Sequence, residues 1–114
     1  MDDFSTPGLV NFFGLRPSVS NYIKPGKRPM SSMSPLIILD EINSVRLVLG
    51  ASGGSRIITA VAQIAIENLW INPNIKECID KKRVHHELYP EYAEVEIGTD
   101  VVKLYLINLF LIYL

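Results

Sequence analysis

The stretch from Gly50 to Ser55, GASGGS, lies between residues typical of a buried strand and residues typical of a helix. Glycines let the backbone turn tightly and bring its N–H groups close to a ligand, and the N-terminus of a following helix adds unpaired donors and positive potential. Such a corner suits an anion or a developing oxyanion. It is not a phosphate loop of the Walker type, because Arg56 and Ile57 stand where that motif needs Lys and then Ser or Thr.

A plainer interpretation of each candidate remains open. Gly53 and Gly54 would also serve a tight strand-to-helix turn, capped by the serine on either side of the pair. Ser31 and Ser32 follow a proline and are typical of turn residues that bond their own backbone. Neither serine lies in the G-x-S-x-G context that marks a nucleophile. On the residues alone, these structural roles are favoured.

The remaining polar candidates do not indicate a metal or cofactor site. His85 and His86 are adjacent, so on a regular strand or helix they point in different directions and cannot readily chelate one ion. We expect them to be solvated or hydrogen bonded. Asp2 and Asp3 are typical of exposed terminal charges. Cys78 is the only cysteine, which excludes an intrachain disulfide and a cysteine-based metal site.

Length and composition indicate one small folded domain. The chain has 114 residues, of which 48% are hydrophobic and 20% charged, with a formal net charge of -1. Its cations are scattered apart from short clusters at residues 24–28 and 81–83, which argues against a nucleic-acid partner. The acidic N-terminus resembles no signal peptide. The apolar residues 104–114 are fewer than the about 20 that a membrane span needs.

The elements that must position the candidates begin after a long irregular segment. Residues 1–35 contain five prolines and three glycines without a sustained period, which predicts loop. Residues 36–40 and 45–50 are rich in aliphatic and β-branched side chains and are separated by the polar stretch EINS. This pattern predicts an antiparallel hairpin of two buried strands.

The second half of the chain predicts two helices and one more strand. Residues 56–70 carry apolar side chains at three- and four-residue steps, and residues 75–80 form a shorter helical pattern that contains the cysteine. Residues 83–90 are polar and predict loop, whereas residues 93–97 alternate at period two and predict a half-exposed strand. The segment from residue 99 onward is compatible with either helix or strand. Together these elements predict an α+β fold.

Several segments, in the same order along the chain, resemble the small subunit of γ-glutamyltransferase, also called γ-glutamyl transpeptidase or glutathione hydrolase. The resemblance rests on DDFS at residues 2–5, PSVSNYIKPGKRPMSSMSP at 17–35, VRLVLGASGGSRI at 45–57, NLW at 68–70 and RVHHELYP at 83–90. It covers residues 1–102. Residues 103–114 form an atypical apolar tail, so the domain division that we predict is 1–102 and 103–114.

The resemblance implies a fold, an activity and partners. The fold would be part of the αββα sandwich of N-terminal-nucleophile hydrolases, with antiparallel strands and packed helices. The activity would be cleavage of the γ-glutamyl amide of glutathione, with transfer of the γ-glutamyl group to water, an amino acid or a dipeptide. No cofactor is implied. The implied partners are glutathione and other γ-glutamyl compounds, an acceptor, and the large subunit of the same precursor.

The resemblance also assigns roles to five residues. Asp3 matches the acidic residue that holds the α-amino group of the substrate, and an ionic hydrogen bond of this kind suits a partly dry cleft. Ser31 and Ser32 match the serine pair that binds the α-carboxylate of the substrate. Gly53 and Gly54 match the glycines whose N–H groups form the oxyanion hole.

Two expectations follow from where the chain departs from the family. The nucleophilic threonine of the family would lie before Met1, so we expect this chain to be inactive by itself. The alternative is a non-catalytic chain that acts only as a structural or interaction partner. The resemblance further implies a location at the extracellular face of the plasma membrane, reached through the large subunit, or secretion as the alternative.

Overall fold

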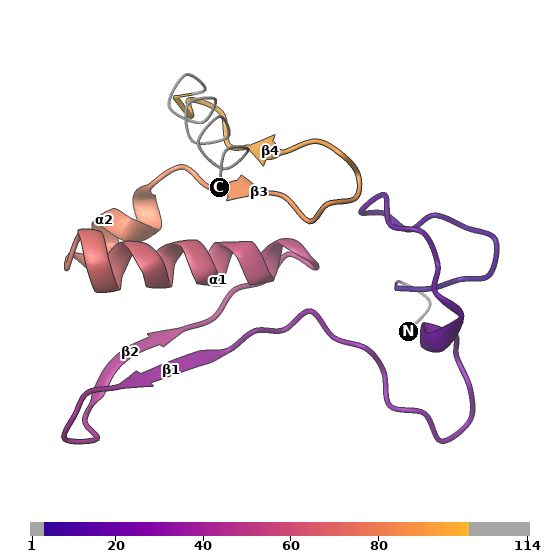
Figure 1. Cartoon of the computed structure of the whole chain (residues 1–114), viewed down its shortest axis with the longest axis horizontal. Coiled ribbons are helices and arrows are strands. Elements are labelled where there is room, and N and C mark those ends of the chain that lie inside the picture. The colour runs from indigo at the N-terminus through magenta and orange to yellow at the C-terminus, as the bar shows by residue number, and fades with distance from the viewer. Residues whose placement is uncertain (1–3, 101–114) are drawn as a thin grey trace, which may run out of the picture.

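The computed structural model describes residues 4–100, and their elements form an α+β arrangement (Figure 1). The predicted tail, and with it the division at residue 102, lies outside the described residues. The elements are η1 (Val19–Asn21), β1 (Leu36–Leu39), β2 (Val45–Leu49), α1 (Arg56–Ile66), the π-helical turn η2 (Glu67–Ile71), α2 (Ile75–Asp80), β3 (Val84–His85) and β4 (Glu94–Val95). In Figure 1, the β1–β2 and β3–β4 hairpins are seen on opposite sides of α1.

Residues 4–35 are irregular apart from the short 3₁₀ turn η1, as the proline and glycine content predicts. In this segment, polar side chains accept hydrogen bonds from backbone N–H groups that a helix or sheet would otherwise satisfy. The Asn11 Oδ1 atom accepts hydrogen bonds from the N–H groups of Phe13 and Leu15, at 3.0 and 2.9 Å. The buried Ser5 hydroxyl accepts one from the N–H of Ser18 at 3.0 Å. These bonds give the loop a defined path past the N-terminus of α1.

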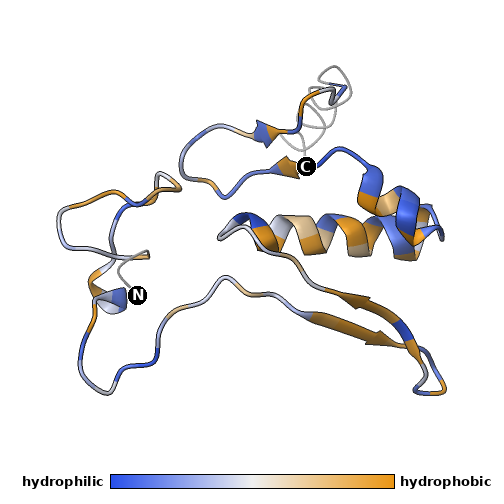
Figure 2. Cartoon of the chain, turned by 180° about the vertical axis from the view of Figure 1, so that it is seen from behind, coloured by the Kyte–Doolittle hydropathy of each residue, from blue (hydrophilic) through white to orange (hydrophobic). Residues whose placement is uncertain are grey.

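Strands β1 and β2 form the predicted antiparallel hairpin. Leu36 is opposite Leu49 and Ile37 is opposite Val48. Because side chains alternate between the faces of a strand, Ile37 and Val48 share one face, and they are 65% and 62% exposed. The other face carries the buried Leu47. Figure 2 shows hydrophobic residues along both strands, so the hairpin has apolar side chains on a covered and an uncovered face.

Helix α1 supplies the largest share of the core. Its buried residues are Ile57, Val61 and Ala65, which recur every four positions and therefore form one stripe. The predicted helix over residues 56–70 is confirmed up to Ile66, and the chain then widens into the π-helical turn η2, where the N–H of Asn72 bonds to the carbonyl of Glu67 at 2.8 Å.

The predicted second helix is α2. Its N-cap is Asn74, whose side chain accepts hydrogen bonds from the N–H groups of Lys76 and Glu77. Cys78, which is only 3% exposed, faces the interior. The short polar break before Asn74 therefore separates two helices, as the sequence predicts.

The prediction that residues 83–90 are loop is wrong for Val84 and His85, which form β3 and pair with β4. The strand predicted over residues 93–97 is shorter than expected. Strand β3 forms because of a contact between residues that are distant in the sequence. Gln63 of α1 donates to the carbonyl of Lys82 at 3.0 Å and accepts from the N–H of Val84 at 3.1 Å, which holds the chain extended beside the helix. A local polar pattern cannot reveal such a contact.

No helix within residues 4–100 is long and apolar enough to cross a bilayer. In the same part of the chain, no three His, Cys, Asp or Glu side chains gather as a group that could hold a metal ion.

Candidate functional site

The glycine pair forms the turn between β2 and α1. Gly53 and Gly54 have φ values of +140° and +63°, a conformation that residues with a Cβ atom rarely adopt. Among residues 4–100, no group accepts a hydrogen bond from the N–H of either glycine. Within the described part of the chain, the turn therefore presents two free backbone donors at the N-terminal end of a helix, an arrangement that suits an anion.

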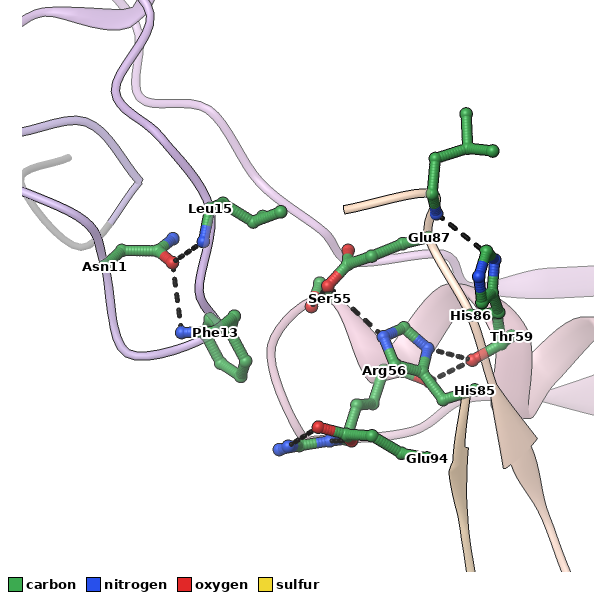
Figure 3. Close-up of polar contacts among 11 residues, drawn as sticks. Asn11, Phe13, Leu15, Ser55, Arg56, Thr59, His85, His86, Glu87 and Glu94 are labelled. Carbon is green, nitrogen blue, oxygen red and sulfur yellow. Dashed lines mark hydrogen bonds and ion pairs between the residues drawn. The ribbon is translucent and has the colours of Figure 1, made fainter. Parts of the chain in front are cut away.

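Phe13 covers Gly54. A Cβ atom added to Gly54 would lie 2.0 Å from Cζ of Phe13, a distance that no real contact permits. The same ring lies beside the Arg56 guanidinium, at 5.6 Å from its centre, and so makes a cation–π contact (Figure 3). Two features therefore favour glycine at position 54, its backbone conformation and the ring above it.

A cleft of about 530 Å³ opens beside the glycine turn. Its walls come from the backbone of residues 50–53, one side of α1, Ile79 of α2, and the two short strands β3 and β4. The lining is mainly apolar, with Ala60, Ile64 and Val84 among its residues and with Arg56 at its polar part. The cleft has the size and composition of a small-molecule site.

Arg56 and Glu94, which both line this cleft, form an ion pair. The guanidinium donates from Nε to Oε2 at 2.5 Å and from Nη2 to Oε1 at 2.9 Å, which is a two-point contact (Figure 3). These hydrogen bonds hold the pKa of the Glu94 carboxyl below its usual value and raise the pKa of the Arg56 guanidinium. The pair keeps the first turn of α1 beside β4.

Four further polar residues are connected at the start of α1. Ser55 donates to Glu87 at 3.1 Å, Glu87 lies 3.3 Å from Nε2 of His85, and Nδ1 of His85 lies 2.7 Å from the Thr59 hydroxyl (Figure 3). His86 accepts a hydrogen bond from the N–H of Leu88, so both histidines are hydrogen bonded, as expected. The spacing of Ser55 and Glu87 in the sequence gives no signal of this network.

The predicted serine pair lies outside the lining of the cleft. The exposed Ser31 hydroxyl accepts a hydrogen bond from the N–H of Met33 at 3.1 Å, and the carbonyl of Ser32 accepts one from the Ser34 hydroxyl at 3.2 Å. In this structure both serines therefore make the local turn contacts that their sequence context predicts. Asp3 lies outside the described residues.

The hairpin register nevertheless directs the serine segment and the glycine turn toward the same end of the sheet. Leu36, the first residue of β1, is opposite Leu49, the last residue of β2. The chain before β1, which contains the serines, and the chain after β2, which contains the glycines, therefore leave the hairpin together. The structure brings these two predicted segments to one end without a hydrogen bond between them among the described residues.

The fold and the glycine turn define an α+β protein with an anion-binding type of strand-to-helix corner. The chain belongs to the γ-glutamyltranspeptidase family, since the model of that family matches residues 1–106. This is a family of enzymes, as the names of its relatives state.

Curated relatives resemble this chain over most of its length. Glutathione hydrolase proenzyme 1 of Schizosaccharomyces pombe is 44% identical over 101 residues, which are 89% of this chain and 16% of that protein. Glutathione hydrolase proenzyme of Escherichia coli is 42% identical over 107 residues, 91% of this chain and 18% of that protein. A scoloptoxin of Scolopendra dehaani is 47% identical over 96 residues, 84% of this chain and 17% of that protein. The chain thus spans about a sixth of each of these relatives.

Solved structures confirm the predicted fold class. A γ-glutamyltranspeptidase mutant from Helicobacter pylori has a TM-score of 0.81 and 42% identity, covering 96% of this chain and 60% of that chain. The enzyme of Pseudomonas nitroreducens complexed with L-DON has a TM-score of 0.76 and 38% identity, covering 90% of this chain and 55% of that chain. The α+β arrangement described above is therefore part of the γ-glutamyltranspeptidase fold.

Three glycine-to-alanine variants separate the two requirements at position 54. Gly50 has open space and an ordinary φ, so Gly50→Ala changes the free energy of unfolding by less than about 0.5 kcal/mol. Gly26 has a φ of +75° and open space, so Gly26→Ala costs about 1–2 kcal/mol from backbone strain. Gly54→Ala adds the overlap with Phe13, worth about 1–3 kcal/mol more. Urea unfolding measures all three, and equal losses for Gly26→Ala and Gly54→Ala would show that the ring imposes no constraint.

The pKa of Glu94 offers a test of the ion pair. Because the folded pKa is lowered, the pair stabilises the fold above the unfolded value of about 4.3 and loses this contribution as the pH falls through the lowered pKa. NMR titration of the Glu94 carboxyl should place its pKa below that value. Arg56→Leu should raise it, while the control Arg46→Leu, on exposed β2, should leave it unchanged. A Glu94 pKa that is the same in the Arg56→Leu variant would contradict the ion pair between Arg56 and Glu94.

Proposed function

We propose that this chain forms the substrate-holding part of a γ-glutamyltransferase, or glutathione hydrolase. The complete enzyme would cleave the γ-glutamyl amide of glutathione and pass the γ-glutamyl group to water, an amino acid or a dipeptide. Membership of the γ-glutamyltranspeptidase family supports this activity class. The specific observation that carries the proposal is the glycine turn, with its two free N–H donors at the start of α1.

The role of the turn is stabilisation of a developing negative charge. When a hydroxyl nucleophile attacks the amide carbonyl of the substrate, the carbonyl oxygen becomes an oxyanion. Two preorganised N–H groups, from Gly53 and Gly54, would bond this oxygen more strongly in the transition state than in the bound substrate. Removing one such donor typically costs about 10²–10³ in kcat.

The γ-glutamyl head group is an α-amino acid and needs two kinds of partner. Asp3 would receive its ammonium group through a charge-assisted hydrogen bond. Ser31 and Ser32 would donate to its carboxylate, and Ser31 can do so while it still accepts the N–H of Met33, because a hydroxyl donates and accepts at the same time. The departure of both segments from one end of the hairpin supports a shared site.

The nucleophile and the rest of the site would come from elsewhere in the enzyme. The threonine that the family uses has no proposed counterpart among the 114 residues, so the chain alone would be inactive. The large subunit of the precursor would complete the site. We further propose the extracellular face of the plasma membrane as its location, with secretion as the alternative.

The first arm of the test assays the purified chain with a chromogenic γ-glutamyl anilide. Turnover should not exceed that of the Asp3→Ala variant. Turnover above that control would contradict the proposed inactivity of the chain alone.

The second arm places residues 1–102 in the matching segment of the Escherichia coli glutathione hydrolase proenzyme, which is 42% identical over this region. This chimera should process the anilide. Ser31→Ala with Ser32→Ala should lower kcat/KM at least about tenfold, the effect of lost bonds to a charged group. Ser34→Ala is the matched control and should have little effect. Equal effects of the two changes would reject the serine pair as the carboxylate site.

A second candidate function is a non-catalytic chain that associates with a large subunit. The uncovered face of the β1–β2 hairpin favours it, because Ile37 and Val48 are adjacent across the strands and both largely exposed. An apolar sheet face of this kind favours association with another surface.

Co-expression with a large subunit tests this candidate. The tagged chain should co-purify with that subunit, and Ile37→Ser with Val48→Ser should weaken the complex at least about tenfold through lost apolar burial. Val19→Ser, at a similarly exposed residue of η1, is the control. A chain that remains alone or aggregates in the presence of the subunit would count against this role.

A further inference from the structure

We propose that Glu87, together with His85, positions the glycine corner by tying the β3–β4 connection to the first turn of α1. This inference rests on the proposed function of Gly53 and Gly54. Glu87 would be a positioning residue, since it acts on the corner through Ser55.

The first turn of α1 shows why a contact with the β3–β4 connection matters. We call this contact, from Ser55 to Glu87 and on to His85, the tie. Ser55 is the N-cap residue, yet its side chain makes no capping hydrogen bond to the first turn. An uncapped first turn leaves several N–H groups without partners and tends to fray. Ser55 is only 7% exposed and donates instead to Oε1 of Glu87, 32 residues further along the chain. This bond satisfies no N–H group of the first turn, but it connects the residue that begins α1 to the β3–β4 connection.

Glu87 is itself held on its other side by His85. The distance from Oε1 of Glu87 to Nε2 of His85 is 3.3 Å, and the two side chains are 23% and 12% exposed. The other ring nitrogen, Nδ1, lies 2.7 Å from the hydroxyl of Thr59, which is on α1 one turn after Ser55. The network thus runs from the N-cap of α1 to the first turn of that helix, and its middle residues are His85 of β3 and Glu87 of the β3–β4 connection (Figure 3). These contacts and the helix backbone close a ring, so a movement of any one of the four side chains breaks at least one contact.

One arrangement of protons satisfies these contacts with a neutral His85. The Thr59 hydroxyl can donate to only one acceptor, and Nδ1 at 2.7 Å is closer than the Arg56 carbonyl at 3.2 Å. With Thr59 donating to Nδ1, a neutral His85 carries its proton on Nε2 and donates it to Glu87. Ser55 donates to the same carboxylate oxygen. Every donor then has an acceptor, and Glu87 is the common acceptor.

The tie affects only the start of α1, because other contacts hold the β3–β4 hairpin against the helix. Gln63 bonds to the backbone on both sides of Arg83, and Arg56 pairs with Glu94. Loss of Glu87 would therefore loosen the start of α1 while β3 and β4 stay in place. The reporters are the N–H groups of Ile57 and Ile58, which bond to the carbonyls of Gly54 and Ser55. The N–H of Glu96, bonded to the carbonyl of Arg83, reports on the hairpin.

Amide hydrogen exchange of the 114-residue chain, followed by NMR, tests the tie directly. Glu87→Ala should speed exchange at Ile57 and Ile58 about tenfold, the effect of roughly one to two lost hydrogen bonds, with exchange at Glu96 unchanged. Glu87→Gln should change it less than about threefold, because both bonds converge on Oε1 and an amide oxygen can accept both. Glu91→Ala, at an exposed residue of the same connection, is the matched control.

Three results would overturn the proposal. One is equal exchange in Glu87→Ala and Glu91→Ala. Another is a Glu87→Gln variant as fast as Glu87→Ala, which would show that the geometry of the shared oxygen is irrelevant. The third is loss of protection at Glu96 as well as at Ile57, which would show general destabilisation.

Kinetics of the chimera distinguish positioning from mere stability. Glu87→Ala should lower kcat about tenfold with KM changed less than about twofold, since an oxyanion donor acts in the transition state. A raised KM with unchanged kcat would contradict the role. If the chimera has no γ-glutamyl activity, the proposed function fails, while the exchange experiment still decides whether Glu87 holds the corner.

Discussion

Burial of a single stripe on α1 is the interaction on which the other elements depend. Ile57, Val61 and Ala65 provide three of the five buried apolar residues among residues 4–100, and Leu47 and Cys78 provide the others. Thr59 and Gln63, at other positions of α1, hydrogen bond to β3, and one face of the β1–β2 hairpin stays largely exposed. A core this small contributes little stability, so polar contacts must fix the parts that packing does not reach. The first turn of α1 is one of these parts.

Local patterns in the sequence predict the elements whose apolar residues repeat at a regular interval. The hairpin follows from two aliphatic runs around a polar turn, where Asp40 accepts hydrogen bonds from Ile42 and Ser44 as such turns favour. The helix follows from the stripe of α1. Strand β3 could not be predicted, because it depends on Gln63 bonding to a polar segment 21 residues away. The π-helical turn at the end of α1 has no local signal either.

The candidate site also combines features that local sequence predicts with features that depend on residues distant in the sequence. The glycine turn was predictable, since a positive φ favours glycine at positions 53 and 54 and the place of the turn before a helix follows from local pattern. The ring of Phe13 above Gly54 and the carboxylate of Glu87 beside Ser55 were not, because each lies more than 30 residues from its partner. The roles of Ser31 and Ser32 come only from resemblance to the family, and their contacts here are those of a turn.

The ion pair of Arg56 with Glu94 affects which species the proposed glycine corner would bind best, the transition state or the carboxylates of substrate and product. A free guanidinium next to the two glycine donors would attract any anion, including the carboxylates of substrate and product, and such uniform binding does not accelerate a reaction. Glu94 accepts hydrogen bonds from both Nε and Nη2 of Arg56, and the Phe13 ring lies beside the same guanidinium. These contacts occupy the cation and leave neutral backbone N–H groups as the donors at the turn. The bond from a backbone N–H strengthens as charge develops on the reacting oxygen. The ion pair would therefore favour the transition state over bound carboxylates, in addition to holding β4 against α1.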